Sequence, residues 1–354
     1  MHHVRLIVCL CLLAGAAAQH AQGQVTPANP LPYIRLGTND ASVVQLEIVA
    51  RKFVSAQEGR PVIWLSAVSH IGETNYYRAL QKHLDAQELV LFEGIGGEEM
   101  KRAERATKNA SPSTNGVTPN SANATKKSEL SSLQTAMAQA LGLVFQLDIV
   151  DYDRAHFRNS DISVAALQKL IGSTNSVART NPNAPPAKGE SANDELQKLL
   201  KMMDSSSAQG ALFQSLFQFI GANPRLRGVV KLALIEILAQ LRGDITQARG
   251  LPPEMQRLFR ILIEKRNEAV LVDLKAELAR HSPAKTISLF YGAAHMNDFE
   301  RQLRALGYRP DAELWLPAFT LDLEQAGVTA FELGLVRTMV RMQMQKMFPN
   351  EKPD

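Results

Sequence analysis

Two similar segments, far apart in the chain, constrain the fold more than any other feature of the sequence. The first is a continuous apolar run at 61–68, followed by His70, a helical pattern and a second short apolar run at 88–92. The same order returns at 286–291, followed by His295 and another helical pattern. Continuous apolar runs of this kind are typical of strands buried on both faces of a parallel sheet. The repeat therefore predicts an α/β fold built from two related half-domains.

The remaining periodicities complete this prediction. We expect a mainly parallel central sheet with helices packed on it and a helical insertion between its two halves. The other expected strands are 43–49, 143–149 and 313–316. The expected helices are 74–84, 195–203, 212–220, 226–241, 253–279, 298–306 and 328–348.

The first 18 residues have the pattern of a secretory signal peptide. Arg5 precedes an apolar run at 6–13, and the small residues at 14–18 form a cleavage site of the Ala-x-Ala type. The apolar run is too short to cross the hydrocarbon core of a bilayer, which is about 30 Å thick. Both cysteines lie inside this segment, so we expect an exported chain, periplasmic or secreted, without disulfides or a cysteine nucleophile.

Composition divides the rest of the chain. A tail at 19–41 is expected to lead into one α/β domain at 42–320, and a C-terminal helix is expected within 321–354. Two stretches, 103–132 and 173–193, are rich in Ser, Thr, Asn, Ala and Pro and carry few large apolar residues. Such stretches bury too little apolar surface to offset their conformational entropy, so we expect two flexible insertions in the domain.

Charge and the C-terminal helix bear on partners. A net charge of +4 is too small for the basic surface of a nucleic-acid-binding protein. The helix at 328–348 is rich in methionine, which favours packing in the core or at the interface of a homodimer. Because Arg341 and Lys346 lie among these methionines, contact with an anionic membrane surface is the less favoured alternative.

Three side chains with useful chemistry follow predicted strands. His70 and His295 each come shortly after an apolar run of the repeat, and Glu93 comes directly after the run at 88–92. Ligand sites in parallel α/β sheets form outside the carboxyl ends of the strands. We therefore expect two imidazoles and one carboxylate at the same edge of the sheet.

Two histidines and a carboxylate are a reasonable set of ligands for a divalent transition metal with open positions. Such a metal lowers the pKa of a bound water and produces a nucleophile near neutral pH. Glu73, three residues after His70, is our candidate for a second, catalytic carboxylate, and Asp298 has the same offset from His295. The alternative is that the histidines only cap or hydrogen-bond the strand ends and that Glu93 is an ordinary charge at the start of a helix.

The order of these motifs resembles that of the TraB/PrgY/GumN group, which includes the TIKI metalloproteases. The first G-x-x-H motif of the group ends at His70, with Ala67 in place of its glycine. The second, from Gly292 to His295, is intact, and Glu93 stands where the glutamate of the group is expected.

The resemblance spans residues 61–316 and includes Arg266 and Asn267, which are similar to an Arg-Asn element of the group. It implies a fold akin to the erythromycin-esterase and ChaN-like group, and metal-dependent hydrolysis, with peptide bonds as the substrate in the TIKI branch. Arg266 would then orient Glu93 or bind a substrate carboxylate or oxyanion, and Asn267 would support a metal ligand. The alternative for Arg266 is a surface residue of a long helix, paired with a neighbouring carboxylate.

These observations lead to one main hypothesis and one alternative. The main hypothesis is an exported hydrolase of a peptide or small molecule that uses manganese, cobalt or zinc. Its metal ligands would be His70, Glu93 and His295, with Arg266 and Glu73 as further catalytic residues. The alternative is a non-catalytic periplasmic binding or accessory protein that holds a small ligand, a metal or haem in the same cleft.

Overall fold

The computed structural model describes residues 32–40, 42–94, 129–163, 166, 169–170, 208–240, 256, 259–280 and 284–348. The predicted signal peptide, the insertion at 173–193 and the helix at 195–203 lie outside the described residues, as does most of the insertion at 103–132.

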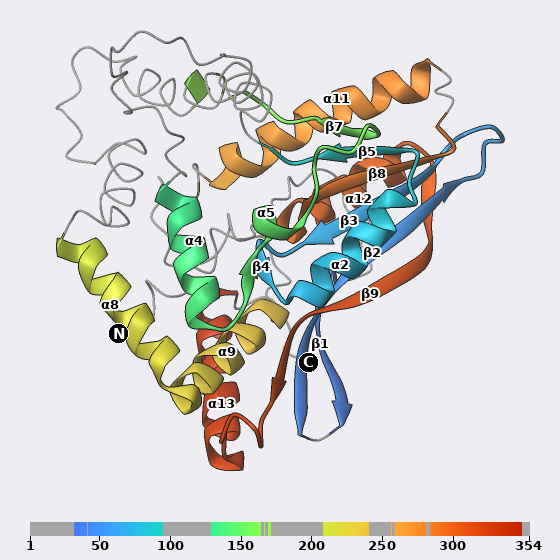
Figure 1. The fold of residues 1–354 in the computed structure, drawn as a ribbon. Coiled ribbons are helices and arrows are strands. Elements are labelled where there is room, and N and C mark those ends of the chain that lie inside the picture. Colours follow the sequence, from blue (N-terminus) through green and yellow to red (C-terminus); the bar gives the residue numbers. More distant parts are fainter. Residues whose placement is uncertain are drawn as a thin grey trace, which may run out of the picture.

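A seven-stranded sheet forms the centre of the fold (Figure 1). Its parallel half has the order β3-β8-β5-β7. These strands are β3 (Val62–Val68), β8 (Thr286–Gly292), β5 (Leu89–Phe92) and β7 (Phe157–Asn159). Because β3 and β8 are direct neighbours, paired from Val62 with Thr286 to Val68 with Gly292, the two similar segments of the sequence end side by side.

The other half of the sheet is antiparallel and is built around β2 (Val43–Ser55). One edge of β2 pairs along its whole length with β9 (Tyr308–Asp322). The opposite edge pairs first with β1 (Ile34–Asp40) and then with β3. A two-stranded sheet of β4 (Ile71–Gly72) and β6 (Val144–Phe145) lies apart from the main sheet.

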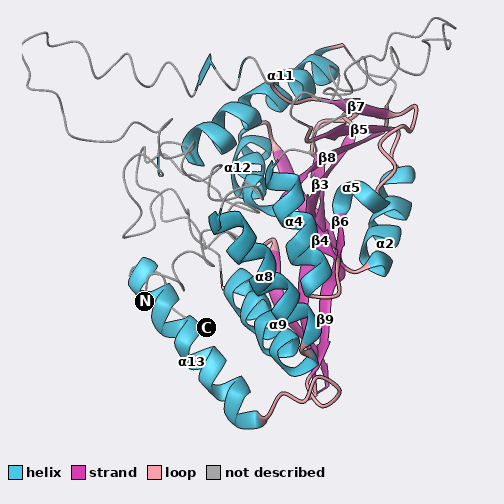
Figure 2. Cartoon of the chain, turned by 60° about the vertical axis from the view of Figure 1, so that its left-hand side comes forward, coloured by secondary structure: helices cyan, strands magenta, loops and turns pink. Residues whose placement is uncertain are grey.

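Helices cover both faces of the main sheet (Figure 2). The helices α2 (Thr74–Asp85) and α5 (Gln146–Ile149) lie on one side, with α9 (Pro224–Ala239) and α12 (Met296–Ala305) on the other. The other α-helices of the described residues are α4 (Glu129–Ala140), α8 (Ala208–Ala222), α11 (Arg266–Ala279) and α13 (Ala330–Met347). The α/β class, with helices packed on a central sheet whose longest parallel run carries the repeat, is confirmed.

Apolar spacing explains why these elements form. The side chains of Ile63, Leu65, Ile287 and Leu289 on the paired strands β3 and β8 are completely buried, as expected for central strands. The helix α2 buries Tyr76, Tyr77, Leu80 and Leu84, which share one face at helical spacing.

The expected strands 43–49 and 313–316 were too short. β2 continues past Val49 through the charged residues Arg51 and Lys52, and β9 continues through two prolines. Pro310 and Pro317 are usually read as ends of a strand, yet both lie within β9. Each lies beside an irregularity in the pairing of β2 with β9, where the register shifts. Proline is tolerated at such bulges because the ladder hydrogen bonds are already interrupted there.

Three other expectations about secondary structure were wrong. The expected strand 143–149 is a strand only at β6 and then turns into the helix α5. The predicted tail 19–41 contains the strand β1, and the short strand β7 was not predicted. Of the insertion at 103–132, residues 129–132 belong to α4. No helix among the described residues is long and apolar enough to cross a membrane.

Candidate active site

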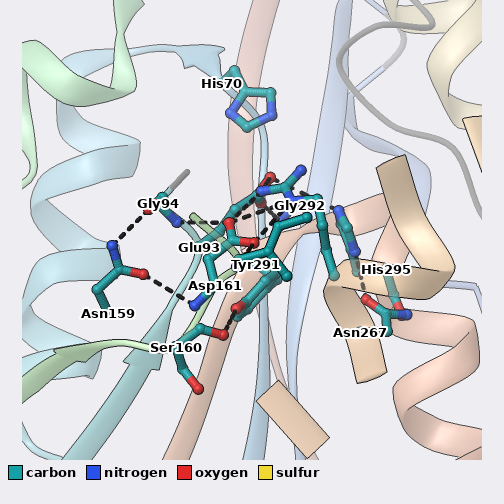
Figure 3. A network of polar contacts seen from close by, with 12 residues as sticks. His70, Glu93, Gly94, Asn159, Ser160, Asp161, Asn267, Tyr291, Gly292 and His295 are labelled. Carbon is teal, nitrogen blue, oxygen red and sulfur yellow. Dashed lines mark hydrogen bonds and ion pairs between the residues drawn. The ribbon is translucent and has the colours of Figure 1, made fainter. Parts of the chain in front are cut away.

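His70, Glu93 and His295 lie around Gly292 (Figure 3). An atom at the position of a Cβ on Gly292 would lie 3.3 Å from Glu93 Oε2 and 3.7 Å from both His70 Nε2 and His295 Cδ2. The strands β3, β5 and β8 carry these residues at their carboxyl ends, where sites in parallel sheets form. The convergence of the three predicted residues agrees with the expectation from the sequence. Glycine at 292 leaves the space between them open.

His295 is held by a buried chain of hydrogen bonds. Its Nδ1 lies 2.6 Å from Asn267 Oδ1, and Asn267 Nδ2 donates to Asp298 Oδ2 at 2.8 Å. Since a carboxylate only accepts, the amide nitrogen of Asn267 faces Asp298 and its oxygen faces the imidazole. The proton of the neutral ring therefore sits on Nδ1, and the unprotonated Nε2 lies 3.8 Å from Glu93 Oε1. Burial lowers the pKa of His295 to about 3, and the nearby Glu93 only partly offsets this effect.

His70 has a similar arrangement on the half-buried side of the site. Its Nδ1 lies 3.0 Å from Gln146 Oε1, and Gln146 Nε2 donates to the hydroxyl oxygen of Tyr152 at 2.5 Å. The backbone N–H of Gln146 also donates to the carbonyl oxygen of His70 at 2.8 Å. Preceding His70, Ser69 is fixed by the hydroxyl of Tyr77, which donates to its carbonyl oxygen at 2.8 Å.

Glu93 is held as a carboxylate by two donors. Nη2 of Arg266 donates to Oε1 at 2.6 Å, and the backbone N–H of Gly292 donates to Oε2 at 2.7 Å. Burial alone would raise the pKa of Glu93. The positive charge of Arg266, the two imidazoles and the Gly292 N–H together outweigh burial and hold this pKa far below its usual range.

Arg266 bridges Glu93 to a second, unpredicted carboxylate. Its Nε and Nη2 donate to Asp161 Oδ1 and Oδ2 at 3.1 and 2.6 Å, in the fork geometry that arginine forms with carboxylates. Arg266 is only 7% exposed, so its interpretation as a surface residue was wrong. It begins α11 directly after a π-helical turn at Ile261–Lys265, which places Arg266 and Asn267 side by side toward the site.

The predicted catalytic residue Glu73 contacts other elements. Its Oε1 accepts hydrogen bonds from Lys231 Nζ on α9 at 3.1 Å and from the backbone N–H of Thr320 on β9 at 2.7 Å. The structure thus joins Glu73 to α9 and β9 instead of to the histidines and Glu93. Asp298, the matching acid after His295, reaches the site only through Asn267.

Two residues of the site were missed from the sequence. Asp161 follows the short strand β7, and Gln146 lies in a segment expected to be a strand. The Asp161 carboxylate also accepts the backbone N–H of Gly94 at 3.0 Å, which fixes the loop after Glu93. No motif marks either residue, because each is brought to the site by tertiary contacts alone.

The donor set of the site has the chemistry that a divalent cation needs. Among the residues described, no group of three or more His, Cys, Asp or Glu side chains is arranged to hold a metal ion. The donor chemistry nevertheless fits, because two imidazoles present unprotonated Nε2 atoms beside one carboxylate. With bonds of about 2.1 Å, two ligands of one zinc ion lie roughly 3.4 Å apart. His295 Nε2 and Glu93 Oε1 are 3.8 Å apart, so this pair of side chains would need to move only slightly closer to bind one ion.

Comparisons with known proteins found no relative of this chain. No protein-family model matches the chain, and neither does any curated protein or solved structure.

Proposed function

We propose that this chain is a metal-dependent hydrolase whose active site is formed by His70, Glu93 and His295. The observation that carries the proposal is the convergence of these three side chains beside Gly292, with Nδ1 of each imidazole next to a carboxamide oxygen. Each Nδ1–H is already used by a carboxamide oxygen, which leaves Nε2 as the atom that can bind a cation.

Each residue of the site would have a separate role in hydrolysis. His70, Glu93 and His295 would hold the cation, which would supply Lewis-acid activation of water and of a substrate carbonyl when bound. Glu93 would serve as a ligand that stays ionised, because Arg266 and the Gly292 N–H hold its pKa far below its usual range. Arg266, 2.6 Å from Glu93, would place a fixed positive charge beside the oxygen that becomes negative in the transition state.

The resemblance to the TraB/PrgY/GumN group supports a finer version of the proposal. The chain would be an exported or periplasmic member with two related half-domains, and its substrate would be a peptide. The parallel pairing of β3 with β8, which brings the two histidine motifs together, is compatible with such half-domains.

The proposal is tested on purified protein stripped of metal with a chelator. Manganese, cobalt and zinc are added back in turn, binding is measured by calorimetry, and a peptide library is screened for cleavage by mass spectrometry. We expect one metal per chain and cleavage that depends on metal, with both lost in His70→Ala and His295→Ala. His83→Ala is the matched control, because His83 contacts Ser66 and Trp64 away from the site. Metal binding without turnover would support the binding-protein alternative, and no metal binding by the parent would exclude the proposal.

A further inference from the structure

The two histidines of the site have matching partners on different elements. Asn267 on α11 presents its amide oxygen to Nδ1 of His295, and Gln146 on α5 presents its amide oxygen to Nδ1 of His70. In both pairs the amide nitrogen is anchored by a third residue. Only the Asn267 arm has a counterpart in a sequence motif.

We infer that Gln146 is the positioning residue of His70, and that Tyr152 holds Gln146 in the orientation this role requires. The amide nitrogen of Gln146 donates to the Tyr152 hydroxyl, and the amide oxygen lies 3.0 Å from Nδ1 of the imidazole. The Tyr152 ring is itself fixed between Phe92 and Phe290, with ring centroids 5.0 and 6.0 Å away. The backbone bond from Gln146 to the carbonyl oxygen of His70 adds a second tie between the two residues.

The consequence concerns the tautomer of His70. A neutral imidazole carries one proton, and an acceptor at Nδ1 keeps the proton there. Without the Gln146 oxygen the proton can move to Nε2, the atom that faces Glu93 and Gly292. A protonated Nε2 can neither bind a cation nor accept a proton. This catalytic consequence depends on the proposed function, whereas the tautomer of His70 can be observed without it.

The two arms differ in charge. His295 is linked through Asn267 to the carboxylate of Asp298, whereas His70 is linked through Gln146 to the neutral hydroxyl of Tyr152. An ionised acceptor makes a stronger hydrogen bond than a neutral one. The His70 arm is therefore the weaker of the two. Because the two arms consist of different residues, changes in the His70 arm are expected to alter His70 and not His295.

The experiment observes the histidine tautomers directly. The full chain is labelled with ¹⁵N at histidine, and long-range ¹H–¹⁵N correlation spectra assign each ring proton to Nδ1 or Nε2. In the parent, His70 and His295 are both expected to carry the proton on Nδ1. Gln146→Leu and the shorter Gln146→Asn are expected to move His70 to a mixture of tautomers and to leave His295 unchanged. Gln146→Glu, which keeps an acceptor oxygen in place, is expected to retain the parent tautomer.

Tyr152→Phe keeps the ring and removes the anchor, so an intermediate shift at His70 is expected. The inference is overturned if His70 keeps its proton on Nδ1 in Gln146→Asn while the melting temperature shows an intact fold. Manganese affinity is measured on the same samples, and Gln146→Asn is expected to weaken it roughly 10- to 100-fold. If the parent binds no metal while the tautomers change as expected, the proposed function fails and the role of Gln146 stands.

Discussion

Replacing Arg266 with Met removes the positive charge between two carboxylates that have little access to water. The side chain of Asp161 is 0% exposed and that of Glu93 is 14% exposed. Arg266 donates to Asp161 at 3.1 and 2.6 Å and to Glu93 at 2.6 Å. Methionine fills much of the same volume but leaves two negative charges side by side. We therefore expect the Arg266→Met protein to be much less stable than the parent.

Removing one partner of a buried ion pair costs about 3–5 kcal/mol. The loss of several charge-assisted hydrogen bonds argues for the upper part of this range. The bonds that Asp161 keeps with Gly94 N–H, and Glu93 with Gly292 N–H, argue for the lower part. We expect a decrease of about 4 kcal/mol in the free energy of unfolding at pH 7.

The effect has a defined pH dependence. Arg266 holds the pKa of Glu93 far below its usual range in the folded protein, against the opposing effect of burial. This part of the stability is complete above the ordinary glutamate pKa of about 4.3 and is lost as the pH falls below it. The difference between the parent and Arg266→Met should therefore shrink in acid.

Urea unfolding followed by circular dichroism at about pH 7 and about pH 3 measures both effects. Lys265→Met is the matched control, because Lys265 is the preceding residue and its ion pair with Glu268 is exposed. That control should cost less than about 1 kcal/mol. The double variant Arg266→Met with Asp161→Asn should recover part of the loss. An effect of Arg266→Met no larger than that of Lys265→Met would refute the reasoning.

Three further predictions follow from the geometry. Burial lowers the pKa of His83 to about 4, so stability should fall by about 3 kcal/mol as the pH drops from about 6.5 to about 4. His83→Gln should remove that loss in the same urea assay, and an unchanged pH profile would contradict the assignment. Gly292→Ala should lower metal affinity and cleavage at least tenfold, because its Cβ would lie 3.3 Å from Glu93 Oε2, while the melting temperature changes little; full affinity would count against the site. Gly228→Ala places a Cβ 2.7 Å from that of Ala326 and should lower the free energy of unfolding by about 1–3 kcal/mol. Gly334→Ala, on the exposed face of α13, should raise it by up to about 1 kcal/mol. Equal effects of the two changes would show that local packing does not decide them.

The sequence predicted the parallel half of the sheet because its signals are local. Strands β3 and β8 are continuous apolar runs, and the turn after each ends in a histidine. Such runs are read directly from the chain, and the carboxyl ends of parallel strands necessarily share one edge. That was sufficient to place His70, Glu93 and His295 together.

What the sequence did not predict depends on contacts between distant residues. Gln146 lies in an expected strand, but it forms a helical turn whose backbone and side chain both bond to His70. Arg51 resembles the charged end of a strand, yet it lies buried within β2 beside Glu300 and Glu313. Lys231 and Thr320 bind the Glu73 carboxylate, so it does not take the catalytic role expected for it. In each case the partner lies between 76 and 262 residues away, where local patterns carry no information.

The most direct test of the central claim is a crystal of the protein soaked with manganese and measured for anomalous scattering. Our account predicts one strong anomalous peak beside Gly292, within bonding distance of His70 Nε2, His295 Nε2 and an oxygen of Glu93. The peak should be absent from a His295→Ala crystal treated in the same way. A parent crystal without a peak at this position, or with manganese bound only elsewhere, would contradict the claim that these residues form a metal-dependent active site.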